Sequence, residues 1–376
     1  MGIYERLGVK RVIHGSGTTT RYGGSMLRPE VLETMREASK QLVNLDELNA
    51  AAGAEIARMI GAEAAFVTAG ASSGLILQTA ACIAGDDPAK IVRLPDTTGM
   101  KNEIVIQRAH RFAYDQAYRV AGGVLVEIGL ARRTQPFELD AAITERTAAV
   151  VYLISPFTRP PGILTLAQTI EIAHKRGVPV IVDAASMLPP RENLTKFLKM
   201  GADLVSFSGG KGIRGPQSTG ILAGRRDLIR AVALNASPNQ ALARAAKTSK
   251  EEICGLVVAL ELFMAEDEAA EMKRYRDVCA VIVEKLTDIP GLRCVVEEDP
   301  VNRPIPHACV YFTEDWRGPS GAAIAQALAK GEPHIYVQQG ANQGGYFDEV
   351  AVDPINLQPG DEAIVAKRLR EELTRR

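Results

Sequence analysis

The sequence is poor in cysteine. It has five cysteines in 376 residues, and none of them are spaced as CxxC. A scattered, odd set of cysteines supports neither the disulfide framework of a small secreted domain nor the paired ligands of a zinc site. We therefore expect buried thiols in a reducing compartment. The five are Cys82, Cys254, Cys279, Cys294 and Cys309.

An excess of charge of one sign is also missing. The 44 Lys and Arg residues face 45 Asp and Glu residues, which leaves a net charge of −1. Proteins that bind nucleic acid or anionic membranes usually carry a basic surface. No stretch approaches the length of a membrane span, and the N-terminal MGIYERLGVKR lacks the apolar core of a signal peptide. These absences predict a cytoplasmic protein with no nucleic acid and no membrane as partner.

What the sequence does contain is an alternation of short apolar runs and helix-like segments, from about residue 50 to residue 230. Val- and Ile-rich runs separated by helices are typical of an α/β fold with a mostly parallel, doubly wound sheet. We expect strands within residues 64–70, 103–107, 123–129, 148–155, 178–186, 202–208 and 218–224.

The C-terminal part has a different pattern. Residues 249–289 read as one long amphipathic helix, which begins with a capping pattern of Ser249 followed by Glu251 and Glu252. We place a domain boundary near residue 245, with a large domain over 1–245 and a smaller α+β domain over 246–376. Strands of the smaller domain are expected at 293–298, 307–312, 334–339 and 349–354.

One lysine stands in an unusual setting. Lys211 lies in the sequence GGKG, directly after the apolar run LVSFS. In sheets of this type, ligands bind at the carboxyl ends of the strands. A lysine shielded from solvent there loses its proton more easily and can form a Schiff base with an aldehyde cofactor. The alternative interpretation is a surface lysine in a flexible glycine loop.

Asp183 ends another apolar run and is expected at the same edge of the sheet. A carboxylate in that place can pair with a protonated pyridine nitrogen and keep a pyridoxal ring electron-withdrawing. A helix N-cap and a metal ligand are the alternatives, but no cluster of His and acidic residues supports a metal. Asp183 and Lys211, each at the end of a strand, together favour the cofactor.

Small residues follow the run at 64–68, where a helix is expected to begin. Backbone amides at such a helix start favour an anion, and small side chains let a phosphate approach them. The stretch matches neither the Walker pattern nor GxGxxG, so it is weak evidence alone, but it suits the phosphate of the same cofactor. The candidate residues are Gly70, Ala71, Ser72 and Ser73, with Ser208 as a further hydroxyl.

Two more polar residues follow expected strands. His110 lies in a polar, aromatic-rich loop, where its flat ring could stack on the cofactor, although most lone histidines are structural. Arg159 follows the run at 148–155, and its planar guanidinium could bind a substrate carboxylate or phosphate. A surface arginine in a proline-rich loop is the alternative.

Five segments together resemble the selenocysteine-synthase-like group of fold-type I enzymes that depend on pyridoxal 5'-phosphate (PLP). They are VKRVIHGSGTTTRYGGS, EIVIQRAHRFAYD, VLVEIG, VDAAS and SFSGGKGIRGPQSTGIL. The resemblance implies that Lys211 carries the Schiff base, Asp183 pairs with the pyridine nitrogen and His110 stacks. It implies further that residues 70–73 and Ser208 hold the phosphate, and that Gln217 reaches the cofactor of a neighbouring subunit in a homo-oligomer.

The same group contains selenium transferases that act on seryl-tRNA and ammonia lyases that act on amino sugar acids. The transferases carry an additional N-terminal tRNA domain, whereas this chain begins close to the catalytic part and has no basic excess, so it resembles the lyase branch. The loop GSGTTTRYGG is expected to line the substrate cavity. Where many fold-type I enzymes have an arginine near the last strand, this chain has Asn356. The substrate anion would then be bound by Arg21, Arg28, Arg159 or Arg303, with Thr20 nearby.

The resulting hypothesis is a PLP-dependent ammonia lyase. It would act on a small 2-amino-3-hydroxy acid or amino sugar acid and release a 2-oxo acid and ammonia. Replacement at the β-carbon and retro-aldol cleavage are the alternatives within enzymes, and a non-catalytic or tRNA-binding relative is the alternative outside them.

Overall fold

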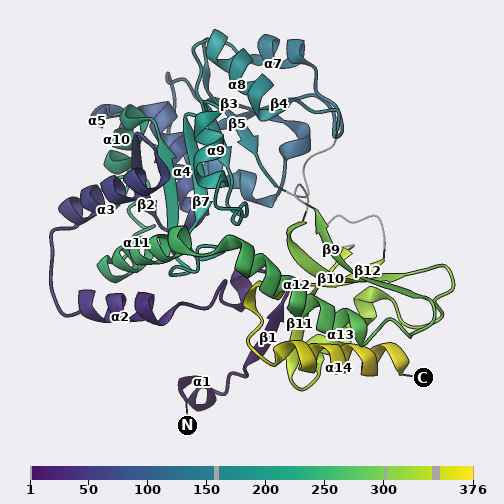
Figure 1. Ribbon diagram of the computed structural model, residues 1–376. Helices are drawn as coiled ribbons and strands as arrows, with labels where there is room; N and C mark the ends of the chain where they lie inside the picture. The colour runs from purple at the N-terminus through teal and green to yellow at the C-terminus, as the bar shows by residue number, and fades with distance from the viewer. Residues whose placement is uncertain (1, 156–160, 300–302, 341–347, 376) are drawn as a thin grey trace. The chain divides into compact units, whose positions relative to one another are not determined.

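The computed structural model describes residues 2–155, 161–299, 303–340 and 348–375 (Figure 1). The chain divides into two compact units. The large unit comprises Leu27–Ala265, and the small unit comprises Met1–Met26 together with Glu266–Arg376.

A seven-stranded sheet forms the centre of the large unit. All of its neighbouring strands are parallel except β8, which is antiparallel to both β2 and β7. The expected α/β fold with a mostly parallel sheet is therefore confirmed. In spatial order the strands are β2 (Ala64–Thr68), β8 (Gly220–Gly224), β7 (Leu204–Ser208), β6 (Val180–Asp183), β5 (Thr147–Leu153), β3 (Glu103–Gln107) and β4 (Val124–Ile128).

Helices cover both faces of this sheet. Side chains alternate between the two faces along a strand. Val105 accordingly belongs to one buried cluster, while Ile104 and Ile106 belong to the other. Burial on both faces explains why the strands read as continuous apolar runs. The helices are α2 (Pro29–Ala38), α3 (Leu45–Ile60), α4 (Gly70–Ala84), α5 (Pro88–Ile91), α6 (Gln116–Val120), α7 (Pro136–Ala142), α8 (Leu166–Lys175), α9 (Asn193–Lys199), α10 (Arg226–Asn235) and α11 (Lys250–Ala265).

The small unit contains a five-stranded sheet. Its order is β1 (Val12–Gly15), β11 (His334–Gln339), β12 (Glu349–Val352), β10 (Arg303–Phe312) and β9 (Leu292–Asp299). The four strands expected from the C-terminal runs are present. Strand β1 was not expected, and it pairs in parallel with β11. The helices of this unit are α1 (Ile3–Arg6), α12 (Glu268–Glu284), α13 (Gly321–Lys330) and α14 (Asp361–Thr374).

The helix expected over 249–289 is two helices, so that prediction was wrong in its length. The capping pattern at its start is present: the Glu252 N–H donates to Ser249 Oγ, and the Ser249 N–H donates to Glu252 Oε2. Helix α11 ends at Ala265, and α12 begins after Asp267, whose side chain accepts the Ala270 N–H as a new N-cap. The backbone leaves the helical conformation at Asp267, which has a φ of −76° and a ψ of 95°.

The division between the units differs from the boundary that we expected near residue 245. It falls after Ala265, because α11 packs against α2 and α3 and buries Leu256 and Leu260 in the core of the large unit.

No helix within the described ranges is both long enough and apolar enough to span a membrane.

Candidate active site

The carboxyl ends of β5, β6 and β7 lie at one edge of the seven-stranded sheet. Leu153 at the end of β5 is the register partner of Asp183 at the end of β6, and Asp183 is the partner of Ser206 in β7. Neighbouring strands lie about 4.8 Å apart. The strand register therefore brings Asp183 and the end of β7, which leads into the Lys211 loop, to the same place.

The loop that carries Lys211 is tightly packed. A Cβ atom at Gly210 would lie 2.3 Å from Gln217 Cα, and one at Gly212 would lie 2.2 Å from the Leu188 carbonyl oxygen. Neither glycine has a positive φ angle. The Arg214 N–H donates to the Lys211 carbonyl oxygen at 2.9 Å and closes the turn. The glycines around Lys211 thus serve close packing, and the loop holds the lysine in place.

The amine of Lys211 lies in a half-buried position near Asp183. Its Nζ donates a hydrogen bond to Ser186 Oγ at 3.3 Å. Burial lowers the pKa of Lys211, and the negative charge of Asp183 opposes that shift in part. Because its pKa is lowered, more of the amine is neutral at a given pH, which suits a nucleophile or a base.

Asp183 is buried, with 3% of its surface exposed. Its Oδ1 accepts the Ala185 N–H at 3.0 Å, which fixes the carboxyl group. Burial raises the pKa of Asp183, while the Ala185 N–H and the charge of Lys211 pull it down. Within the part of the chain that the structure describes, Asp183 forms no ion pair. Burial makes an ionised carboxylate costly, so a cationic group of a ligand beside Asp183 would be stabilising.

His110 is almost completely covered. It ends a 3-10 helix (Arg108–His110) after β3, and 1% of its surface is exposed. Its ring meets Tyr152 edge-on, with centroids 4.6 Å apart. Its Nδ1 accepts the Leu153 N–H at 3.4 Å. Burial lowers the pKa of His110 to about 4. The structure leaves little open ring face, and the predicted stacking stays a prediction.

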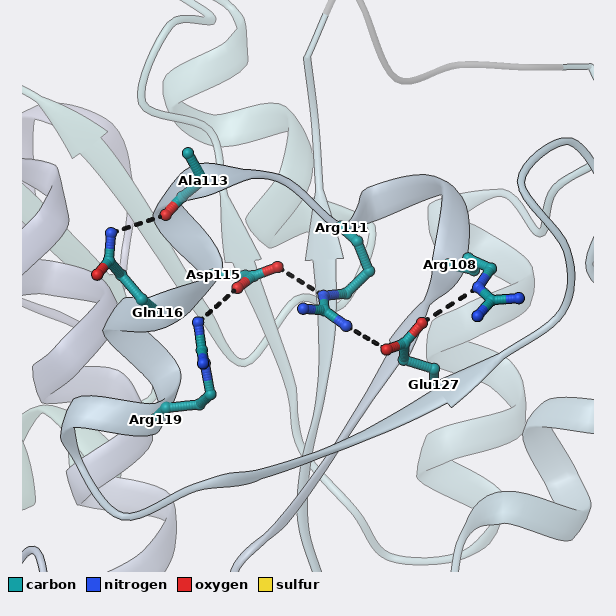
Figure 2. A network of polar contacts seen from close by, with 7 residues as sticks. All are labelled: Arg108, Arg111, Ala113, Asp115, Gln116, Arg119 and Glu127. Atoms are coloured by element: carbon teal, nitrogen blue, oxygen red, sulfur yellow. Dashed lines mark hydrogen bonds and ion pairs between the residues drawn. The ribbon is translucent and has the colours of Figure 1, made fainter.

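A network of charged side chains holds the loop that follows His110 (Figure 2). Arg111 Nε donates to Asp115 at 2.5 Å, and the same guanidinium reaches Glu127 on β4. Arg119 approaches Asp115 at 3.5 Å, and Arg108 donates to Glu127 at 3.3 Å. The network ties both sides of His110 to the neighbouring strand and helix.

The predicted phosphate-binding residues lie at the start of α4. Gly70 has a φ of +73° there, and Ser73 is buried with no hydrogen-bond partner for its Oγ among the described residues. Across the sheet edge, Gly220 is the register partner of both Thr68 and Ser208. A Cβ at Gly220 would lie 2.6 Å from the Gly70 carbonyl carbon. The strand register thus brings the helix start and Ser208 together, with one buried hydroxyl unpartnered.

Other predicted residues are less informative. Arg159 lies outside the described residues. Thr20 and Arg21 are exposed in the small unit, and Arg303 begins β10 of the same unit. Gln217 is exposed in the Lys211 loop, and Arg28 is half-buried before α2. Their roles stay predictions.

Asn356 has a role that sequence reasoning missed. Its Nδ2 donates to the carbonyl oxygens of Gly17 and Gly24, at 2.7 Å each. Both amide hydrogens are therefore used to hold the N-terminal loop. Sequence reasoning also missed Ser186, whose Oγ accepts a hydrogen bond from Lys211 Nζ. Its position three residues after Asp183 was the signal that could have identified it.

Comparison with known proteins gives consistent findings. A family model described as L-seryl-tRNA selenium transferase matches residues 11–281. The chain is 33% identical to D-glucosaminate-6-phosphate ammonia lyase of Salmonella typhimurium, over 98% of this chain and 97% of the relative. It is also 33% identical to 5'-C-glycyluridine monooxygenase-decarboxylase of a Streptomyces species, over 98% and 92%.

A solved structure of a D-glucosaminate-6-phosphate ammonia lyase matches with a TM-score of 0.85 and 32% identity, over 99% of this chain and 98% of that one. The expected fold-type I architecture is confirmed.

Proposed function

Because the chain belongs to the L-seryl-tRNA selenium transferase family, we propose that it is a PLP-dependent ammonia lyase acting on an amino sugar acid or another small 2-amino-3-hydroxy acid. The products are a 2-oxo acid and ammonia. The observation that carries the proposal is the meeting of Lys211 and Asp183 at the ends of neighbouring strands, each affecting the other's pKa.

The residues present suit PLP. Asp183 is a buried carboxylate without an ion-pair partner in the described structure, and Lys211 is an amine with a lowered pKa. Ser73 offers a buried hydroxyl without a partner in the same described part of the chain, at a helix start that favours an anion. When bound, PLP supplies an electron-withdrawing ring that stabilises negative charge on the substrate.

Lys211 would form the covalent link to PLP and would move the proton of the substrate. Burial lowers its pKa, so its Nζ is able to act as nucleophile and then to accept the proton from the substrate Cα. Ser186 Oγ accepts a hydrogen bond from the same Nζ and orients it. The packed glycines beside Lys211 keep this geometry fixed.

Asp183 would keep the ring nitrogen of PLP protonated. Its Oδ1 is already oriented by the Ala185 N–H. An ionised carboxylate beside a protonated ring nitrogen keeps that nitrogen cationic, and this is the charge that the buried site otherwise lacks. Asp183 is therefore the residue that maintains the electron-withdrawing character of the ring.

The phosphate of PLP would be bound at the start of α4 and the end of β7. Gly70 and Ala71 are small residues at the helix start, which let a phosphate approach the backbone. Ser73 would contribute its hydroxyl, which has no partner among the described residues, and Ser208 would add a second hydroxyl from the end of β7. His110 lies in the 3-10 helix that follows β3, on the other side of β5 and β6 from β7.

Two variants test the proposal. Lys211→Ala should lose the PLP adduct that borohydride traps, together with 2-oxo acid and ammonia release from a panel of amino sugar acids and 2-amino-3-hydroxy acids. Asp183→Asn should keep the cofactor but lose at least about tenfold in kcat, because an amide does not hold the ring nitrogen protonated. Lys196→Ala, an exposed lysine on α9, is the matched control. A reduced adduct on another lysine, or full activity of Asp183→Asn, contradicts the assignment.

A second candidate is oxidative decarboxylation, which the equal identity to the Streptomyces monooxygenase-decarboxylase favours. Oxygen uptake and CO₂ release, without ammonia release from hydroxy amino acids, would support it over the lyase. We also propose a cytoplasmic assembly of at least two chains, which sedimentation of the purified protein tests.

A further inference from the structure

The tautomer of His110 follows from one hydrogen bond. The Leu153 N–H lies 3.4 Å from His110 Nδ1. A backbone N–H can only donate, so Nδ1 must be the acceptor and carries no proton. In the neutral ring the single proton then lies on Nε2.

This Nε2–H has no acceptor in the described part of the chain. Among the described residues, no hydrogen-bond partner reaches His110 Nε2, and the side chain is 1% exposed. Native proteins pair nearly all of their buried polar groups, and exceptions often mark a functional role. An oriented donor with no partner at a sheet edge is therefore suited to a ligand.

The position of His110 supports that use. Leu153, which fixes the ring, is the register partner of Asp183 in the neighbouring strand. His110 follows β3, so it lies two strands away from the carboxylate that we assign to the cofactor, with β5 between them. The ring is edge-on to Tyr152 and almost fully covered, so neither of its faces is open for stacking.

We propose that His110 acts as a neutral hydrogen-bond donor to an anionic oxygen at this site, through Nε2–H, instead of as a stacking ring. This inference rests on the proposed function. The oxygen belongs either to the cofactor, as its phenolic oxygen, or to the substrate, as its carboxylate or phosphate.

Neutrality is part of the proposal. The groups that face the ring are the Tyr152 hydroxyphenyl and the Leu153 N–H on β5, while Arg108 and Arg111 flank it on its own loop. Both arginines bind Glu127, and Arg111 also binds Asp115, so their charges are balanced. Burial lowers the pKa of His110 to about 4, so the donor keeps one proton at neutral pH.

Two substitutions separate donation from stacking. His110→Phe keeps a flat ring and removes the donor, whereas His110→Gln removes the ring and keeps an N–H donor. Donation predicts that kcat/KM of His110→Gln exceeds that of His110→Phe by at least about tenfold, as expected for a lost hydrogen bond to a charged oxygen. His174→Gln, on α8, is the matched control and should behave like the wild type.

The His110→Phe variant shows whether the oxygen belongs to the cofactor or to the substrate, because PLP affinity changes in the first case and KM in the second. If the oxygen belongs to the cofactor, His110→Phe weakens PLP binding and shifts the absorbance of the PLP-bound protein. If it belongs to the substrate, KM rises while PLP binding and absorbance stay as in the wild type.

A measurement without cofactor or turnover completes the test. ¹⁵N NMR of the cofactor-free protein should show a neutral His110 with the proton on Nε2, and no titration between pH 5.5 and 8. A proton on Nδ1, a titration near the ordinary histidine pKa, or equal activity of the Phe and Gln variants overturns the proposal, as does greater activity of the Phe variant. If the wild type instead forms no PLP adduct on Lys211, the proposed function fails, while the NMR result still decides the tautomer.

Discussion

At the scale of single residues, Asn356 shows how a departure from a family pattern acquires a physical meaning. The sequence identified it only as an asparagine at a place where related enzymes often have arginine. In the structure its two amide hydrogens bind the carbonyl oxygens of Gly17 and Gly24, and the side chain is 8% exposed. An amide suits this place because two carbonyls need two donors on one nitrogen.

We expect Asn356→Ala to destabilise the protein by about 2 kcal/mol, because it leaves two buried carbonyl oxygens without their donors. Asn356→Asp should cost at least as much, since a carboxylate oxygen would face the two carbonyl oxygens. Urea denaturation measures both changes.

Asn239→Ala is the matched control. The Asn239 amide also donates to a backbone carbonyl, that of Ala233, but at an exposed position. Its substitution should change the free energy of unfolding by less than about 0.5 kcal/mol. Equal effects at the two positions would show that Asn356 does not hold the N-terminal loop.

At the scale of elements, the segment between β3 and α6 is a loop whose shape depends on charge pairs (Figure 2). Asp115 is 4% exposed and lies between Arg111 and Arg119, while Glu127 on β4 binds Arg111 and Arg108. These pairs tie the segment that carries His110 to α6 and β4, and we expect them to help hold the His110 ring in place together with the Leu153 N–H.

We expect Asp115→Asn to cost about 2 kcal/mol of stability and to broaden or shift the His110 ¹⁵N signals. The cost lies below that of breaking a fully buried pair, because Arg111 keeps Glu127 as a partner. Thermal or urea unfolding gives the first quantity and NMR the second.

Arg108→Ala serves as the comparison within the same network. The Arg108 side chain is 58% exposed, so its pair with Glu127 should contribute less than about 1 kcal/mol. An Asp115→Asn variant that is as stable as Arg108→Ala, with unchanged His110 signals, would argue against a positioning role for the network.

At the scale of the whole molecule, the two ends of the chain build one sheet. Strand β1 pairs with His334–Val337 of β11, whereas β12 pairs only with Gln338 and Gln339 of that strand. The first part of β11 therefore depends on a segment more than 300 residues away in the sequence.

Deletion of residues 2–15 should raise hydrogen exchange at residues 334–337 by at least about tenfold, because their strand partner is removed. Exchange at the central strands β5 and β6 of the large unit should stay unchanged. Deletion of residues 2–8 alone, which carries only the exposed helix α1, is the control. Mass spectrometry of peptides covers each region, and unchanged exchange at 334–337 in the longer deletion would disprove the dependence.

The sequence by itself determined the features that local pattern encodes. Apolar runs bounded by turns identified the strands of both sheets other than β1, and Lys211 and Asp183 were identified because each directly follows or ends such a run. The capping box at Ser249 was also readable, since it needs only two residues three positions apart.

Only the tertiary structure decided features that depend on distant partners. Three contacts join segments far apart in the chain: the pairing of β1 with β11, the donation of Asn356 to Gly17 and Gly24, and the donation of the Leu153 N–H to His110. The glycines beside Lys211 suggested flexibility in the sequence, but their neighbours Gln217 and Leu188 make them positions of close packing. The physical reason is common to all of these: a hydrogen bond, a register or a steric limit belongs to two groups, and the sequence near one of them does not contain the other.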